Sequence, residues 1–162
     1  MAAPRVRVTK DNSDYLYELQ KSEGCPFARF ADILGFAAAY AAHRGKTPSH
    51  IKSSELGNKP EPMELHLFGA GDNSDNFFKV NLVTLLGVYG DRNFDSFKSN
   101  SDDHGLEHRV KNFESLANQG LELLQAEIKA GTYMPLVEIF ENLCMEAINS
   151  ENAPVQNTAD LV

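Results

Sequence analysis

The sequence predicts a mainly helical protein: a single-domain bundle of about five helices, with one or two short strands near the N-terminal third. Three observations support this prediction. Apolar residues recur every three or four positions over several long stretches, which is the period of an amphipathic helix. Glycines stand where these patterns stop, as at helix C-termini. The chain has 162 residues, 42% apolar and 23% charged, which suits one globular domain with its own core.

The first element expected is a short strand at residues 5–9, RVRVT, where basic and β-branched side chains alternate. Asp11 or Ser13 can cap a helix that follows and continues to about Ser22. Gly24 then stops this helix. Its apolar side is formed by Tyr15, Leu16 and Leu19.

An alanine-rich helix comes next, within the stretch RFADILGFAAAYAAHRGK, residues 29–46. Pro26 suits its first turn, and Gly45 ends it. Only a narrow strip around Arg29 and Asp32 is polar, so we expect this helix to be central and buried. Its small side chains imply that another helix approaches closely, either within one chain or across an oligomer interface.

The middle of the chain is harder to assign. Residues 46–62 are polar and hold three prolines, so they are expected to form a loop. The alternation in residues 63–68, MELHLF, predicts a short strand. A helix is expected from about Ser74 to Tyr89. The residues predicted on one side of it are Phe78, Leu82, Leu85, Leu86 and Tyr89.

Two helices complete the predicted bundle. The longest runs from about Asp103 to Ala130, and Gly131 closes it. Its apolar stripe consists of Leu106, Val110, Phe113, Ala117, Gly120, Leu124 and Ile128. A last helix starts near Pro135, with Leu136, Phe140, Leu143 and Ala147 facing inward. We therefore place one helical domain at residues 1–149 and a polar, disordered tail at 150–162.

The distribution of charge limits the possible partners. The net charge is −8, which disfavours a general nucleic-acid binder. Residues 1–60 hold nine basic and six acidic side chains, a net of +3, whereas residues 61–162 carry a net of −11. Two isolated cysteines, Cys25 and Cys144, fit a reducing compartment. Because no secretory signal or membrane span is evident, we expect a cytoplasmic protein.

One motif could suggest metal catalysis. HGLEH, residues 104–108, matches the HxxEH pattern in which two histidines bind zinc and the glutamate acts as a general base. No third ligand stands out downstream, and Glu107 also suits an acidic helix start. No serine, cysteine or lysine lies in a recognisable nucleophile motif. We therefore expect no catalytic residue, no metal, no cofactor and no enzymatic activity.

An alternative function is DNA binding. Strand, helix, tight turn and helix is the order of a ribbon–helix–helix regulator, in which strand arginines enter the major groove. An edge strand whose arginines face solvent explains the same pattern, and the acidic bulk of the chain favours that explanation. If DNA is contacted, weakly, the expected residues are Arg5, Arg7, Lys10, Arg44 and Lys46.

Three segments resemble, in order, a known family. GCPFARFADILGFAAAYAAHRGKTP, EPMELHLF and FESLANQGLELLQAEI are similar to successive stretches of Dnd system-associated protein 4. These are small proteins found beside bacterial DNA phosphorothioation genes. The likeness covers about residues 5–147. It singles out segments that contain Gly35, Gly45 and Gly120, and it supplies no catalytic residues.

The resemblance implies a setting in defence against foreign DNA. We expect a non-enzymatic accessory or interaction subunit of a phosphorothioation-linked anti-phage system. Its partners would be proteins of the same operon, with self-association left open. Because aromatic residues beside charges are common at interfaces, the expected protein-contact residues are Phe77, Phe94 and Phe97.

Overall fold

The computed structural model describes residues 4–68, 83–87, 89, 103–131 and 133–151. Its elements, in chain order, are β1 (Arg5–Val6), α1 (Lys10–Lys21), α2 (Phe30–His43), β2 (Met63–Glu64), the 3-10 helix η1 (Leu65–Phe68), α5 (Asp103–Ala130) and α6 (Leu136–Glu151). Residues 83–87 are also helical. The predicted class, mainly helical with short strands near the N-terminus, is confirmed.

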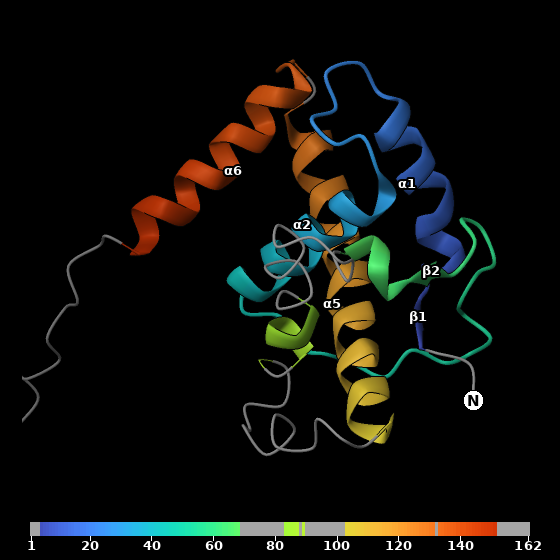
Figure 1. The fold of residues 1–162 in the computed structure, drawn as a ribbon. Coiled ribbons are helices and arrows are strands. Elements are labelled where there is room, and N and C mark those ends of the chain that lie inside the picture. The colour runs from blue at the N-terminus through green and yellow to red at the C-terminus, as the bar shows by residue number, and fades with distance from the viewer. Residues whose placement is uncertain (1–3, 69–82, 88, 90–102, 132, 152–162) are drawn as a thin grey trace, which may run out of the picture.

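The centre of the molecule is the contact between α2 and α5 (Figure 1). A Cβ atom on Gly120 of α5 would overlap the backbone carbonyl group of Ala37 in α2. Ala37, Ala38 and Ala41 are completely buried. The close helix contact that the small residues predict is therefore confirmed, and it lies within one chain.

Helix α2 ends as predicted but starts later. Gly45 has φ +74°, and the Lys46 N–H donates to the carbonyl of Ala41, which is the hydrogen bond of a Schellman cap. The start at Pro26 is wrong, since the helix begins at Phe30. Arg29 lies just before it in extended backbone and forms an ion pair with Asp32 at 2.8 Å.

The predicted cap of α1 is also wrong. The residue before the helix is Thr9, and no side chain caps the N-terminus. Ser13 lies inside the helix and is buried. Its hydroxyl group donates to the carbonyl of Lys59 in the long loop. A residue type that often caps helices is used here to hold a distant segment.

The sheet is small. β1 pairs antiparallel with β2, Arg5 opposite Glu64 and Val6 opposite Met63. Residues 65–68, predicted to continue the second strand, form η1 instead. The turn lets Phe68 reach the core, where its ring meets Phe113 of α5 edge-on at 5.4 Å.

The remaining helices match their predicted periodicity in part. α5 has the predicted bounds. In the helical residues 83–87, Leu86 is buried but Leu85 is 61% exposed, so Leu85 does not share the buried side of Leu86 as predicted. α6 extends to Glu151, two residues beyond the predicted domain boundary. Phe78 and Leu82 lie outside the described residues.

Candidate interaction site

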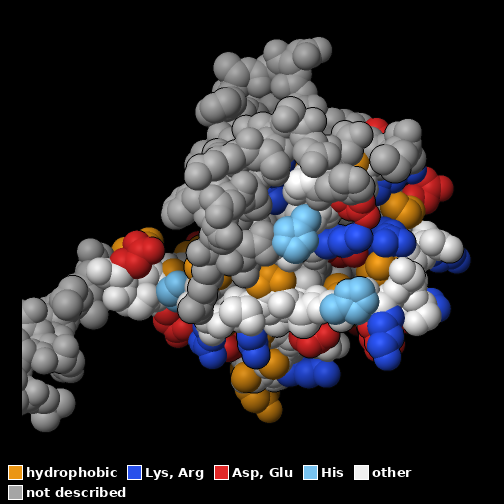
Figure 2. All heavy atoms as spheres, turned by 90° about the horizontal axis from the view of Figure 1, so that it is seen from below, with side chains coloured by type: hydrophobic (Ala, Val, Ile, Leu, Met, Phe, Trp, Pro, Cys, Tyr) orange, Lys and Arg blue, Asp and Glu red, His pale blue; other side chains and the backbone are white. Residues whose placement is uncertain are grey.

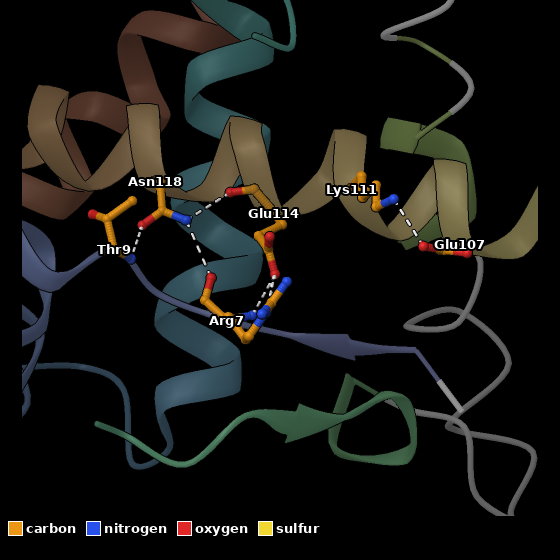
Figure 3. Close-up of polar contacts among 6 residues, drawn as sticks. All are labelled: Arg7, Thr9, Glu107, Lys111, Glu114 and Asn118. Atoms are coloured by element: carbon orange, nitrogen blue, oxygen red, sulfur yellow. Dashed lines mark hydrogen bonds and ion pairs between the residues drawn. The ribbon is translucent and has the colours of Figure 1, made fainter. Parts of the chain in front are cut away.

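The α5 segment that carries the family resemblance holds residues 7–9, directly after β1, through two buried side chains (Figure 3). Glu114 accepts a hydrogen bond from the Arg7 N–H at 2.7 Å. Asn118 accepts from the Thr9 N–H at 2.9 Å and donates to the Arg7 carbonyl at 3.2 Å. Side chains of a helix thus supply the partners that a neighbouring strand would otherwise provide.

Glu114 is a strongly desolvated carboxyl group. Its side chain is 6% exposed, and the guanidinium of Arg7 lies 3.8 Å away. Burial raises the pKa of Glu114, and this effect outweighs the opposing hydrogen bond and charge of Arg7. The group holds backbone in place and lies under β1, so its environment indicates a structural role.

The same α5 segment holds a second piece of chain. Ser115 accepts a hydrogen bond from the Ser49 N–H at 2.8 Å, and Gln119 donates to the carbonyl of Thr47 at 2.9 Å. Together with Glu114 and Asn118, these residues fix both the N-terminal strand and the loop after α2. These polar residues therefore stabilise the fold through hydrogen bonds to two segments that are distant in sequence.

The five basic residues predicted for DNA contact are mostly engaged within the chain. Arg5 forms an ion pair with Glu64 at 3.1 Å, and Arg7 lies beside Glu114. Lys10 donates to the Ser54 carbonyl. The remaining two residues are close in sequence: Arg44 lies 3.9 Å from Glu127 and over the ring of Tyr40, and Lys46 is exposed. Figure 2 shows basic and histidine side chains interspersed with acidic ones on the face drawn.

The ribbon–helix–helix arrangement is not what the structure shows. On one edge, β1 pairs with β2, and beyond it Val8 and Lys10 bond to residues 55–57. On the other edge, Arg7 and Thr9 bond to α5. A symmetric ribbon needs a free strand edge for the second subunit, and both edges of residues 5–10 are occupied by the same chain.

Several sequence predictions fall on residues that the structure does not describe. Phe77, Phe94 and Phe97 lie outside the described residues, and so does the side chain of His104. His108 is exposed. Within the described ranges, no group of three or more metal-ligating side chains occurs, and both Cys25 and Cys144 are free thiols.

The surface that sequence reasoning missed is on α6. Phe140 fixes the first half of this helix by edge-on contacts with Phe27 and Phe36 at 5.2 and 5.1 Å. Toward its C-terminal end, α6 leads away from the other labelled elements (Figure 1). Phe140 and Leu143 are buried, which confirms the prediction that they face inward.

A second face of α6 is exposed and mostly apolar, with Glu141 within it. Val137 is 41% exposed, Met145 53% and Ile148 52%, and exposed Cys144 lies on the same side of the helix. We call Val137, Cys144, Met145 and Ile148 the α6 strip. The charged residues of α6 are all acidic: Glu138, Glu141, Glu146 and Glu151. The sequence LVEIFENLCMEAI could have indicated this exposed face, because it has more apolar positions than one inward face of a helix needs.

A cavity of about 560 Å³ lies beside the start of α6. Its walls come from α1, the C-terminal end of α5 and residues 134–139. Leu19 and Ile139, both buried, form part of the apolar lining, while Glu18 and Glu23 are exposed at the α1 side. Met134, next to the fully exposed Tyr133, also belongs to the cavity wall.

A comparison with protein families identifies the same family that three segments of the sequence resemble. The family model for DNA sulphur modification system-associated protein 4 matches residues 5–161. The chain belongs to this family. No curated protein and no solved structure matches it. Across the described ranges, none of the helices combines the length and apolar character that crossing a membrane requires.

Proposed function

We propose that this protein is a non-enzymatic accessory subunit of a phosphorothioation-linked anti-phage defence system, and that it binds a basic partner protein along α6. Family membership supports the setting, because the family is associated with DNA sulphur modification systems. The observation that carries the docking role is the α6 strip, an exposed and mostly apolar face that also holds Glu141, one turn from Val137 and from Met145.

The apolar part of the strip supplies the affinity in this proposal. Burying a Val, Ile or Met side chain fully contributes roughly 1.5–3 kcal/mol relative to leaving it exposed. Val137, Met145 and Ile148 each keep about half of their surface in water. A partner helix lying along this face would remove that surface, in the way amphipathic helices bind apolar grooves.

The charges define the partner. Four glutamates on α6, with no lysine or arginine among residues 136–151, attract a basic surface and repel an acidic one. A second copy of the chain docking α6 against α6 would bring like charges together, which is unfavourable. An anionic lipid surface is disfavoured for the same reason. A basic protein of the same system is the occupant that fits.

The test is co-expression of the tagged protein with its neighbouring genes, followed by affinity purification at low and high salt. We expect an operon protein to co-purify under both conditions, with a lower yield at about 1 M salt, because salt screens the exposed charges but leaves the apolar contacts in place. Val137→Ser with Met145→Ser should abolish co-purification. Asn142→Ser with Asn149→Ser, on the polar side of the same helix, is the matched control and should leave it unchanged.

Cys144 offers an independent measurement without a substitution in the strip. Its thiol is exposed, so a maleimide reagent should label it quickly in the free protein and slowly in the complex. If no neighbouring protein co-purifies, or if the complex labels at the same rate as the free protein, α6 is not the docking surface. Cleavage or modification of DNA by the isolated protein would contradict the non-enzymatic role.

A further inference from the structure

The cavity beside α6 has the size and lining of a site for a small molecule. Its volume of about 560 Å³ lies within the roughly 300–1,000 Å³ typical of ligand sites. The buried Leu19 and Ile139, together with the half-buried Ile128 and Leu136, give it an aliphatic lining. A hydrocarbon body placed there would lose much of its contact with water, which favours binding.

The charged groups of the lining favour a cation. Glu18 and Glu23 lie on the α1 side, and Lys129, near the end of α5, is the one basic residue among the described residues of the lining. Tyr15 adds no charge, because burial is the main cause that raises the pKa of its hydroxyl group. Carboxylates thus outnumber ammonium groups here, on a chain whose net charge is −8, and both facts favour a positively charged ligand.

The polar side chains of this lining are available to a ligand. Glu18 and Glu23 are exposed, and Gln125 is half-buried. Within the part of the chain that the structure describes, no hydrogen bond or ion pair joins these three side chains to another residue. Each carboxylate can accept a charge-assisted hydrogen bond from an ammonium or guanidinium group. A few polar groups on a mostly apolar lining are typical of a ligand pocket.

We propose that the cavity between α1, α5 and α6 is a binding site for a small amphipathic organic cation, a free molecule with an aliphatic body in the cavity and an ammonium or guanidinium group beside Glu18 and Glu23. The site is separate from the α6 strip, because Leu136 and Ile139 lie on a different side of α6 from Val137. Binding in the cavity does not require a partner protein at the strip.

The test is an NMR titration of the full, isotope-labelled chain with three probes that share one octyl chain: octylammonium, octan-1-ol and octanoate. We expect octylammonium to bind at least about tenfold more tightly than octanoate, with octan-1-ol between them, because the carboxylates attract the ammonium group and repel the carboxylate. The chemical-shift changes should be largest at the backbone amides of Leu19, Gly131 and Ile139, which belong to the lining.

A blocking variant tests whether the probe occupies the cavity. Ser22 is exposed and lines the cavity, so Ser22→Trp places an indole in the space that the ligand needs. It should weaken octylammonium binding at least about tenfold, since two groups cannot fill the same volume. Ser53→Trp, the same change at an exposed loop position outside the lining, is the matched control and should leave binding unchanged. Circular dichroism confirms that both variants are folded.

A second pair of variants tests the charges. Glu18→Gln with Glu23→Gln should remove most of the preference for octylammonium over octan-1-ol. Glu61→Gln with Glu151→Gln removes the same charge at exposed positions outside the lining, so it should keep that preference.

Several results would overturn the proposal: no binding of any probe, octanoate binding as tightly as octylammonium, or equal effects of a lining variant and its matched control. Chemical-shift changes confined to the α6 strip, or spread over the acidic surface, would also overturn it. All of these results leave the docking role of α6 intact, because that role is measured by co-purification of an operon protein.

Discussion

Tyr15 and Tyr40 show how differently two tyrosines can be placed in the same small protein. The Tyr40 hydroxyl group donates to Glu127 at 3.0 Å, whereas the Tyr15 hydroxyl group has neither solvent nor a partner among the described residues. A buried hydroxyl group without a partner costs about 1–3 kcal/mol. In the free protein, the Tyr15 ring therefore stabilises the fold while its hydroxyl group does not.

Replacing each hydroxyl group in turn should give effects of opposite sign. We expect Tyr15→Phe to raise the free energy of unfolding by about 1 kcal/mol, because it removes an unsatisfied polar group. Tyr40→Phe should lower it by about 1 kcal/mol, because it removes a hydrogen bond. Urea unfolding of the two variants and the wild type measures this. Equal losses in both variants would show that the Tyr15 hydroxyl group has a partner.

Glu114 should make stability depend on pH in an unusual direction. Its pKa is raised in the folded protein, chiefly by burial, so the folded state binds this proton more tightly than the unfolded state. The contribution of Glu114 to stability is then complete at low pH. It is lost as pH rises from the ordinary glutamate range, about 4.3, through the folded value.

Glu114→Gln isolates that contribution, since the amide does not titrate and its oxygen can still accept from the Arg7 N–H. We expect the stability advantage of the wild type over Glu114→Gln to shrink as pH increases from 4 to 7, as measured by urea unfolding at several pH values. An advantage that grows with pH would mean that Arg7 stabilises the carboxylate more than burial destabilises it.

At the scale of elements, the contact between α2 and α5 depends on missing side-chain volume. Gly120 faces the backbone of Ala37, not a flexible side chain, so neither partner can move aside without separating the helices. Close packing makes such a position intolerant of added atoms. This contact explains why a helix so rich in alanine can form the centre of the molecule.

Ala37→Leu should lower the free energy of unfolding by about 1–3 kcal/mol, because overpacking a filled contact forces strain. Gly120→Ala should have an effect of similar size, although it adds a single methyl group. Ala126→Leu, at an exposed position of α5, is the control and should change stability by less than about 0.5 kcal/mol. Melting temperatures that stay equal in all three variants would show that the helices are not in close contact.

At the scale of the whole molecule, the distribution of charge determines how strongly the protein can bind DNA. The net charge is −8, and Arg5, Arg7 and Arg44 each lie within 4 Å of a carboxylate oxygen. Three of the five basic residues predicted for DNA contact therefore already lie beside a carboxylate, which weakens their attraction for phosphate groups.

We expect binding to duplex DNA, with or without phosphorothioate linkages, to be weak and to fall steeply with salt. Fluorescence anisotropy should give a dissociation constant of about 10⁻⁴ M or weaker at physiological salt, the weak end of non-specific binding. If binding is detected, Arg5→Glu with Arg7→Glu should abolish it. Tight binding that survives this double change would place a DNA site elsewhere in the molecule.

The helical class, the bounds of α5 and the Gly45 end of α2 were predictable from local pattern. A period of 3.6 residues and a residue with positive φ are properties of short stretches of chain, so the sequence carries them directly. The small residues of α2 likewise predicted that another helix packs closely against it. They did not indicate which helix this would be. The family resemblance pointed to the α5 segment that holds residues 7–9.

Other features depend on how distant segments meet. Ser13 donates to Lys59 and not to its own helix end. β1 pairs with β2, and the residues that follow β1 bond to Glu114 and Asn118. The α6 strip and the cavity exist because the core covers only the first half of α6 and leaves space beside α1. No local pattern encodes which part of an apolar face stays uncovered, because that depends on the size and placement of every neighbour.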